Sequence, residues 1–113
     1  MTFEQLGLNP KVLQAINDLG FSTPTPIQEK AIPHLLGTQS DFVGLAQTGT
    51  GKTAAFGLPL VSIADVSMKR PQGLVICPTR ELCLQISSDI EKYAAHSGHK
   101  IIAVYGGSDI RRQ

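Results

Sequence analysis

The chain has 113 residues, 42% of them hydrophobic, and a formal net charge of +1 at pH 7. This length fits one domain or part of one, and the apolar content is sufficient for a folded core, which excludes a disordered tail. The near-neutral charge excludes a global basic field, so any contact with nucleic acid must come from a local arrangement of residues. Because the N-terminus lacks a signal-peptide pattern and no apolar stretch is long enough to span a bilayer, we expect a soluble, cytoplasmic protein without membrane contact.

The first part of the chain predicts two helices joined by a proline-rich connection. Asn9-Pro10 is typical of a helix start, and the apolar residues that follow share one helical face as far as Gly20. Two prolines in residues 20–28, GFSTPTPIQ, favour an extended backbone. Thr25-Pro26 can then start a second helix, which we expect to stop at Gly37.

Residues 46–53, AQTGTGKT, match a phosphate-binding loop, with Ala46 in place of the usual first glycine. A short apolar run, residues 42–46, predicts a buried strand before the loop, and the segment after it is compatible with a helix. Glycine lets the backbone approach a polyphosphate closely, and the amides at the helix start point at the anion. We expect the whole loop to bind a nucleoside triphosphate: Ala46, Gln47, Thr48, Gly49, Thr50, Gly51, Lys52 and Thr53. In this interpretation Lys52 reaches the β- and γ-phosphates, and the Thr53 hydroxyl binds Mg²⁺.

The helix after Lys52 contains Gly57 and Pro59, which predict a bend or break near Leu58. Residues 74–77 form a second apolar run, short and β-branched enough for a buried strand. Pro78-Thr79 turns the chain into a further helix, whose apolar residues repeat at helical spacing: Leu82, Ile86, Ile90 and Tyr93.

Residues 101–105 predict a third strand, which Gly106-Gly107 closes. The order strand, helix, strand, helix, strand is typical of an α/β fold with a parallel sheet and flanking helices. Ligands in such folds bind outside the carboxyl ends of the strands, where all three predicted strands end in small or polar residues. Cys77 and Cys83 have no metal-ligand spacing and are expected to be reduced thiols.

Together these motifs resemble the first RecA-like domain of DEAD-box RNA helicases. GFSTPTPIQ looks like the Q motif of the family, AQTGTGKT like its Walker A loop, and PTRELCLQ like its motif Ia, with Cys83 where alanine is usual. The glycine pair at 106 and 107 matches the GG element of the family. The resemblance implies a partial RecA-like P-loop NTPase domain over residues 1–113, with the Q-motif region in residues 1–37 and the P-loop, motif Ia and GG core in residues 38–113.

The resemblance implies an ATP site in which Gln28 selects adenine. A glutamine amide can donate to and accept from one base edge, and this matches N7 and N6 of adenine but not guanine. Phe21 would stack on the adenine ring, Thr23 would help to line the pocket, and Phe3 resembles the upstream aromatic residue of the family. The simpler alternatives are core packing for the two phenylalanines and a solvated helix position for Gln28.

The resemblance also implies contacts with the sugar-phosphate backbone of RNA, independent of sequence. The residues concerned are Pro78, Thr79, Arg80, Gly106 and Gly107. Arg80 would lie in the first turn of its helix, where the dipole disfavours a cation unless an external anion is present. A simple N-cap role for Thr79 and an ordinary turn at the glycine pair are the alternatives.

The chain ends before the DEAD sequence of the family, and the second RecA-like domain is missing too. We therefore expect the 113 residues alone neither to hydrolyse ATP appreciably nor to unwind RNA, because phosphoryl transfer depends on groups that are not in this sequence. The parent protein would be an ATP-dependent RNA helicase with RNA-stimulated ATP hydrolysis that separates short RNA duplexes. The alternatives are a catalytically inactive module that binds nucleotide or RNA, and a different P-loop NTPase such as a DNA helicase or a transport ATPase.

Overall fold

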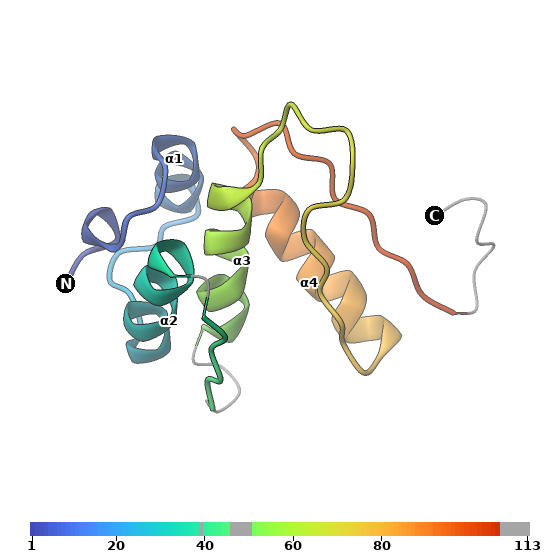
Figure 1. Ribbon diagram of the computed structural model, residues 1–113, viewed down its shortest axis with the longest axis horizontal. Helices are drawn as coiled ribbons and strands as arrows, with labels where there is room; N and C mark the ends of the chain where they lie inside the picture. The colour runs from blue at the N-terminus through green and yellow to red at the C-terminus, as the bar shows by residue number, and fades with distance from the viewer. Residues whose placement is uncertain (39, 46–50, 107–113) are drawn as a thin grey trace.

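Helices make up the regular structure of the computed structural model, which describes residues 1–38, 40–45 and 51–106 (Figure 1). They are the 3-10 helix η1 (Phe3–Leu6) and the α-helices α1 (Pro10–Asp18), α2 (Pro26–Gly37), α3 (Lys52–Ile63) and α4 (Arg80–Tyr93). The central helix α3 packs against α2 on one side and α4 on the other, and α1 contacts both α3 and α4. Within the described ranges, no helix has the length and apolar character needed to cross a membrane.

The starts of α1, α2 and α4 follow the signals in the sequence. The Asn9 side chain accepts a hydrogen bond from the Val12 amide at 2.9 Å, and the Thr79 hydroxyl accepts one from the Leu82 amide at 3.1 Å. Pro26 occupies the first position of α2, where the missing N–H leaves no intrahelical bond unmade. These three predicted helices are confirmed.

Helix α3 is continuous from Lys52 to Ile63, although a bend or break was predicted near Leu58. The prediction of a break is wrong because the tertiary environment outweighs the local cost of proline. Leu58 and Pro59 are both fully buried between neighbouring helices. A proline inside a helix costs roughly 3 kcal/mol, but most helical stability in proteins comes from the packing of such buried faces.

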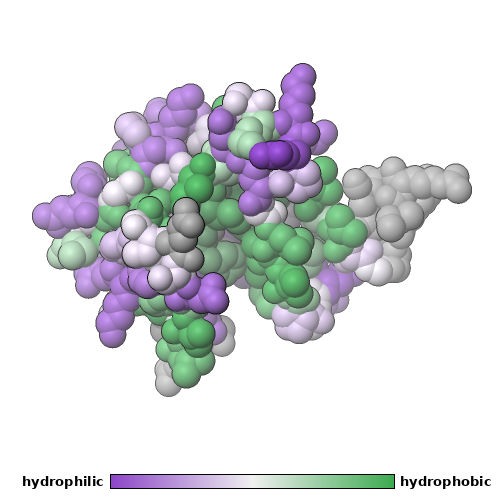
Figure 2. Space-filling view, viewed as in Figure 1, coloured by the Kyte–Doolittle hydropathy of each residue, from purple (hydrophilic) through white to green (hydrophobic). Residues whose placement is uncertain are grey.

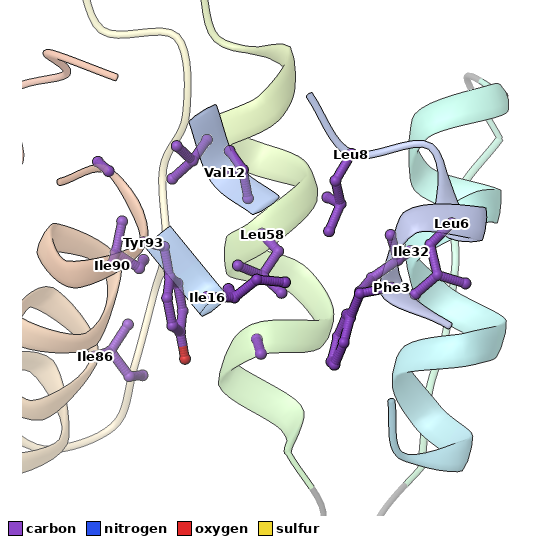
Figure 3. Packing of buried hydrophobic residues seen from close by; sticks show 13 residues of the cluster. Phe3, Leu6, Leu8, Val12, Ile16, Ile32, Leu58, Ile86, Ile90 and Tyr93 are labelled. Carbon is purple, nitrogen blue, oxygen red and sulfur yellow. The ribbon is translucent and has the colours of Figure 1, made fainter. Parts of the chain in front are cut away.

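A single apolar core joins the helices (Figure 3). Leu58 of α3 lies at its centre and has no exposed surface. Residues from the first part of the chain pack on one side of it and residues of α4 on the other: Phe3, Leu6 and Ile32, and Ile86, Ile90 and Tyr93. This core fixes α3 relative to α4, and both helices begin in the lower half of the molecule in Figure 1.

The segments predicted as strands carry no strand pairing within the described residues. Residues 42–45, 74–77 and 101–105 run as irregular chain, so the predicted parallel sheet is not formed there. Side chains in residues 74–77 nevertheless alternate between partly buried and exposed, as in a strand. Val75 and Cys77 pack against the core, whereas Leu74 and Ile76 are exposed. Figure 2 shows apolar surface where the segment before α4 crosses the front of the molecule. A strand of a parallel sheet is normally covered on both faces, whereas only one face of residues 74–77 is covered in this structure.

Besides the apolar core, two hydrogen bonds join the start of α1 to the end of α3. The backbone amide of Asn9 donates to Ser62 Oγ at 2.9 Å, and Asn9 Nδ2 donates to the Ser62 carbonyl oxygen at 3.3 Å. Asn9 therefore uses its side-chain oxygen to cap α1 and its side-chain nitrogen to hold α3.

Candidate functional site

Gln28 lies at the contact between α2 and the start of α3. Its Oε1 accepts a hydrogen bond from the Thr25 amide at 2.9 Å, and its Nε2 donates to the Gly51 carbonyl oxygen at 3.2 Å. The residue is only 4% exposed. The alternative of a solvated helix position is therefore excluded for Gln28. The structure instead places Gln28 in contact with Gly51, the residue directly before Lys52.

Gly51 and the first two residues of α3 are the part of the predicted phosphate-binding loop that the structure describes. Gly51 precedes the helix with φ +83° and ψ +28°, a left-handed conformation that glycine adopts without strain. Lys52 and Thr53 are the first two residues of α3, with the Lys52 side chain exposed and Thr53 half-buried. The first amides of a helix have no intrahelical partner, and the exposed Lys52 side chain starts from the same turn. The other predicted loop residues lie outside the described residues: Ala46, Gln47, Thr48, Gly49 and Thr50.

The three remaining residues predicted for the adenine pocket are placed differently from one another. Phe3 is 3% exposed and belongs to the core. Its ring centroid lies 5.9 Å from that of Phe21, and the Phe21 centroid lies 6.2 Å from that of Tyr93 in a T-shaped arrangement. Phe21 is half-buried and Thr23 is exposed. The buried position of Phe3 favours core packing, whereas Phe21 and Thr23 remain accessible.

The residues predicted to contact RNA gather around the start of α4. Pro78, Thr79, Arg80 and Gly106 line one hollow of about 370 Å³ between residues 74–80 and residues 104–106. All four of these residues are exposed. Thr79 is the N-cap of α4, as the simpler interpretation held, so its side-chain oxygen is already used by a helix amide. Gly107 lies outside the described residues.

Tyr105 contributes to this surface and was missed by the sequence analysis. The Arg80 guanidinium carbon lies 4.8 Å from the centroid of the Tyr105 ring, a cation–π contact. The ring thus supports the arginine beside the first amides of α4. The signal was an aromatic residue directly before a glycine pair, but only the fold shows that it meets the motif 25 residues earlier in the sequence.

The cysteines next to this surface do not form a metal site or a disulfide. Cys77 and Cys83 are free thiols, and the described residues contain no group of three or more metal-ligating side chains. Desolvation raises the pKa of Cys77, and the neighbouring Cys83 raises it further. A raised pKa favours the protonated thiol, which is a poor nucleophile, so Cys77 is not expected to carry covalent chemistry.

Comparison with known protein families gives one clear match. Residues 25–113 match the model of the family described as "DEAD/DEAH box helicase". The chain is also 49% identical over 112 residues to the DEAD-box ATP-dependent RNA helicase CshA of Bacillus cereus. This alignment covers 99% of the chain but 21% of the relative, so the chain spans about a fifth of the length of that helicase.

Solved structures give the same result for the fold. The RNA helicase Prp28 from Chaetomium thermophilum, bound to ADP, matches 98% of this chain and 28% of its own, with a TM-score of 0.85 and 39% identity. Dbp5 of S. cerevisiae, bound to RNA and ADP BeF3, matches 86% of this chain and 25% of its own, with a TM-score of 0.82 and 34% identity. These similarities confirm the predicted fold class, a partial RecA-like α/β domain, although the described residues do not themselves pair into its sheet.

Proposed function

This chain belongs to the DEAD/DEAH box helicase family, and from that premise we propose that it supplies the adenine-binding, phosphate-binding and first RNA-contacting elements of a DEAD-box ATP-dependent RNA helicase. The similarity to RNA helicases does not favour another P-loop NTPase or an inactive module. The whole protein would couple ATP hydrolysis, stimulated by RNA, to the separation of short RNA duplexes.

The observation that carries this proposal is the hydrogen bond from Gln28 Nε2 to the Gly51 carbonyl oxygen. It joins the predicted purine-reading residue to the turn that precedes Lys52. In a nucleotide the ribose separates the base from the phosphates by a short distance. A single nucleotide can therefore contact Gln28 through its base and the turn before Lys52 through its phosphates only if these two parts of the protein lie close together. Gln28 and Gly51 are 23 residues apart in the sequence, and the fold brings them into contact.

The residues at the start of α3 fit the phosphates of ATP. Lys52 is exposed there and can neutralise phosphate charge, while the first amides of the helix can donate to phosphate oxygens. The Thr53 hydroxyl would hold a Mg²⁺ ion, which would neutralise charge on the phosphates when it is bound. Lys52 and Thr53 would thus position the phosphoryl group, while Gln28 orients the base.

The start of α4 supplies the RNA-contacting surface of this proposal. Arg80 is exposed, is supported by Tyr105, and lies beside helix amides, so a phosphate bound there would meet both a cation and N–H donors. Such contacts hold the backbone of the strand and carry no sequence information. Gly106 lines the same hollow and leaves room for a sugar-phosphate chain to approach.

Substitution of Gln28 tests the adenine site directly. In the full-length protein, Gln28→Ala is expected to weaken ADP binding much more than GDP binding, because a bidentate pair with one base discriminates by roughly 1–3 kcal/mol. Gln14→Ala, at an exposed position of α1, is the matched control and should leave both affinities unchanged. Equal affinity of the unmodified protein for ADP and GDP, measured by isothermal titration, would refute the proposal.

The 113-residue chain and the full-length protein should differ in turnover. We propose that RNA-stimulated ATP hydrolysis belongs to the full-length protein and that the chain alone lacks it, because the chain spans only about a fifth of the length of CshA. Steady-state phosphate release with and without single-stranded RNA measures this. Robust RNA-stimulated turnover by the 113 residues alone would contradict this expectation.

A further inference from the structure

The amide of Gln28 is held at both of its ends by backbone groups. Thr25 N–H can only donate, and it meets Oε1 at 2.9 Å; the Gly51 carbonyl can only accept, and it meets Nε2 at 3.2 Å. A glutamine amide that is turned over would face an acceptor with its oxygen and a donor with its nitrogen. Only one of the two orientations therefore satisfies both neighbours, and the 4% exposure leaves little water to replace them.

We propose that Gly51 is a specificity-determining position for the base as well as a part of the phosphate turn. Its carbonyl, together with the Thr25 amide, fixes which end of the Gln28 amide donates and which end accepts. Gly51 thereby acts as a positioning residue for adenine recognition. The inference rests on the adenine site proposed above and adds the group that orients it.

The hydrogen-bonding capacity of the amide matches this role. A glutamine amide has two N–H donors and an oxygen with two lone pairs. The bonds to Gly51 and Thr25 use one donor and one acceptor position, so one of each remains for a ligand. Adenine presents an acceptor at N7 and a donor at N6, whereas guanine presents acceptors at both N7 and O6. The held amide can therefore bind adenine without releasing either neighbour, and it can satisfy only one of the two guanine acceptors.

The absence of a side chain at residue 51 is part of the same arrangement. A Cβ added there would collide with Gln28 Nε2 and would lie 3.2 Å from Thr25 Oγ1. Nε2 is the far end of a flexible side chain, so Gln28 would have to move, and the φ of +83° would in addition strain the backbone of any residue with a Cβ. The Gly51 carbonyl also accepts the first hydrogen bond of α3, from the Ala55 amide at 3.1 Å. Both lone pairs of this oxygen are thus used, one by the helix and one by the base-reading side chain.

The test compares the ratio of GDP to ADP dissociation constants in the full-length protein, because a defect that affects only phosphate binding weakens both nucleotides equally. Gln28→Ala is expected to lower the ratio by roughly 5- to 150-fold, the range for one bidentate base contact. Gly51→Ala should lower the ratio by a similar factor, and the double variant should show no further loss. If Gly51→Ala weakens ADP and GDP equally while Gln28→Ala lowers the ratio, the inference is wrong and the adenine site stands. If Gln28→Ala leaves the ratio unchanged, the adenine site itself is wrong and the inference falls with it.

A second pair of variants avoids any folding defect of Gly51→Ala. Thr25 has φ −74° and ψ 164°, a conformation that proline can adopt, so Thr25→Pro removes the N–H that holds Oε1. Gln14→Ala, at an exposed position of α1, serves as the control. The inference requires a lower GDP-to-ADP ratio in Thr25→Pro and an unchanged one in Gln14→Ala. An unchanged ratio in Thr25→Pro would overturn the claim that the backbone orients Gln28.

Discussion

Gly57 sets how closely helix α3 approaches α4, and its replacement by alanine tests this packing. A Cβ at residue 57 would lie 3.2 and 3.3 Å from two ring carbons of Tyr93 and 3.4 Å from Ile90 Cγ1. Alanine gains about 1 kcal/mol over glycine inside a helix. Overpacking of a well-packed core costs about 1–3 kcal/mol, and the Tyr93 ring is buried, so it cannot easily move away. We expect Gly57→Ala to destabilise the protein by about 1 kcal/mol net.

Urea unfolding, followed by circular dichroism, measures this change in a double-mutant cycle. In a Tyr93→Leu background the two tight contacts are gone and only the ordinary contact with Ile90 remains. Gly57→Ala should then be stabilising by about 1 kcal/mol, which gives a coupling energy of about 2 kcal/mol between the two positions. Gly37→Ala is the control, because a Cβ at this helical residue of α2 meets nothing within 4 Å. A higher stability of Gly57→Ala in the unmodified protein would refute the reasoning.

Three further outcomes follow from the described residues. Burial, and to a lesser extent Asp89, raise the pKa of Tyr93 from 10.0 to about 12, so the stability that the neutral phenol contributes is complete below pH 10 and is lost as the pH rises through 12. Urea midpoints at pH 8 and pH 11 should differ less in Tyr93→Phe, and an equal difference would contradict this assignment. Arg80→Gln should weaken binding of all single-stranded RNA sequences alike and reduce the slope of log affinity against log salt by about 0.7. Arg70→Gln, in an exposed connection, is the control and should leave both quantities unchanged. Identical slopes for Arg80→Gln and the unmodified protein would exclude a phosphate contact of Arg80. The isolated 113-residue chain should bind the dye ANS, and Ile76→Ser should reduce its fluorescence because Ile76 is 86% exposed; an unchanged signal would place the apolar surface elsewhere.

The helix starts could be predicted because their causes lie within a few residues. Asn9 and Thr79 cap the helices that follow them through bonds to amides three residues ahead, and that information is local. The continuity of α3 could not be predicted in this way. It depends on the burial of Leu58 and Pro59 by helices distant in the sequence, which no local pattern of glycine and proline reveals.

The predicted strands show the same limit. The apolar runs at 74–77 and 101–105 have the composition of buried strands, but a strand also needs partners on its edges, and within the described residues these runs have none. The similarity to Prp28 nevertheless supports the fold class inferred from their order along the chain.

The site was predicted in its parts but not in its connections. Gln28, Lys52 and Arg80 stood out because each belongs to a recognisable motif. The hydrogen bond from Gln28 to Gly51 and the contact of Arg80 with Tyr105 join segments 23 and 25 residues apart, so only the packing of the helices could show them. The bond from the Thr25 amide to Gln28 was also not predicted, although a threonine followed by a glutamine three residues later is the sequence signal for such a capping box.

Asn9 is a position where aspartate would not be an adequate substitute, for a reason unrelated to the start of a helix. The two residues cap helices equally well. Only asparagine, however, has a side-chain N–H to give to the Ser62 carbonyl oxygen, and a carboxylate at this place would face that oxygen with like partial charge. Gln28 contacts the residue before α3, and Asn9 contacts the residue next to the end of α3, so one side-chain carboxamide donates a hydrogen bond at each end of this helix. A substitution at either one could shift this helix without touching a nucleotide.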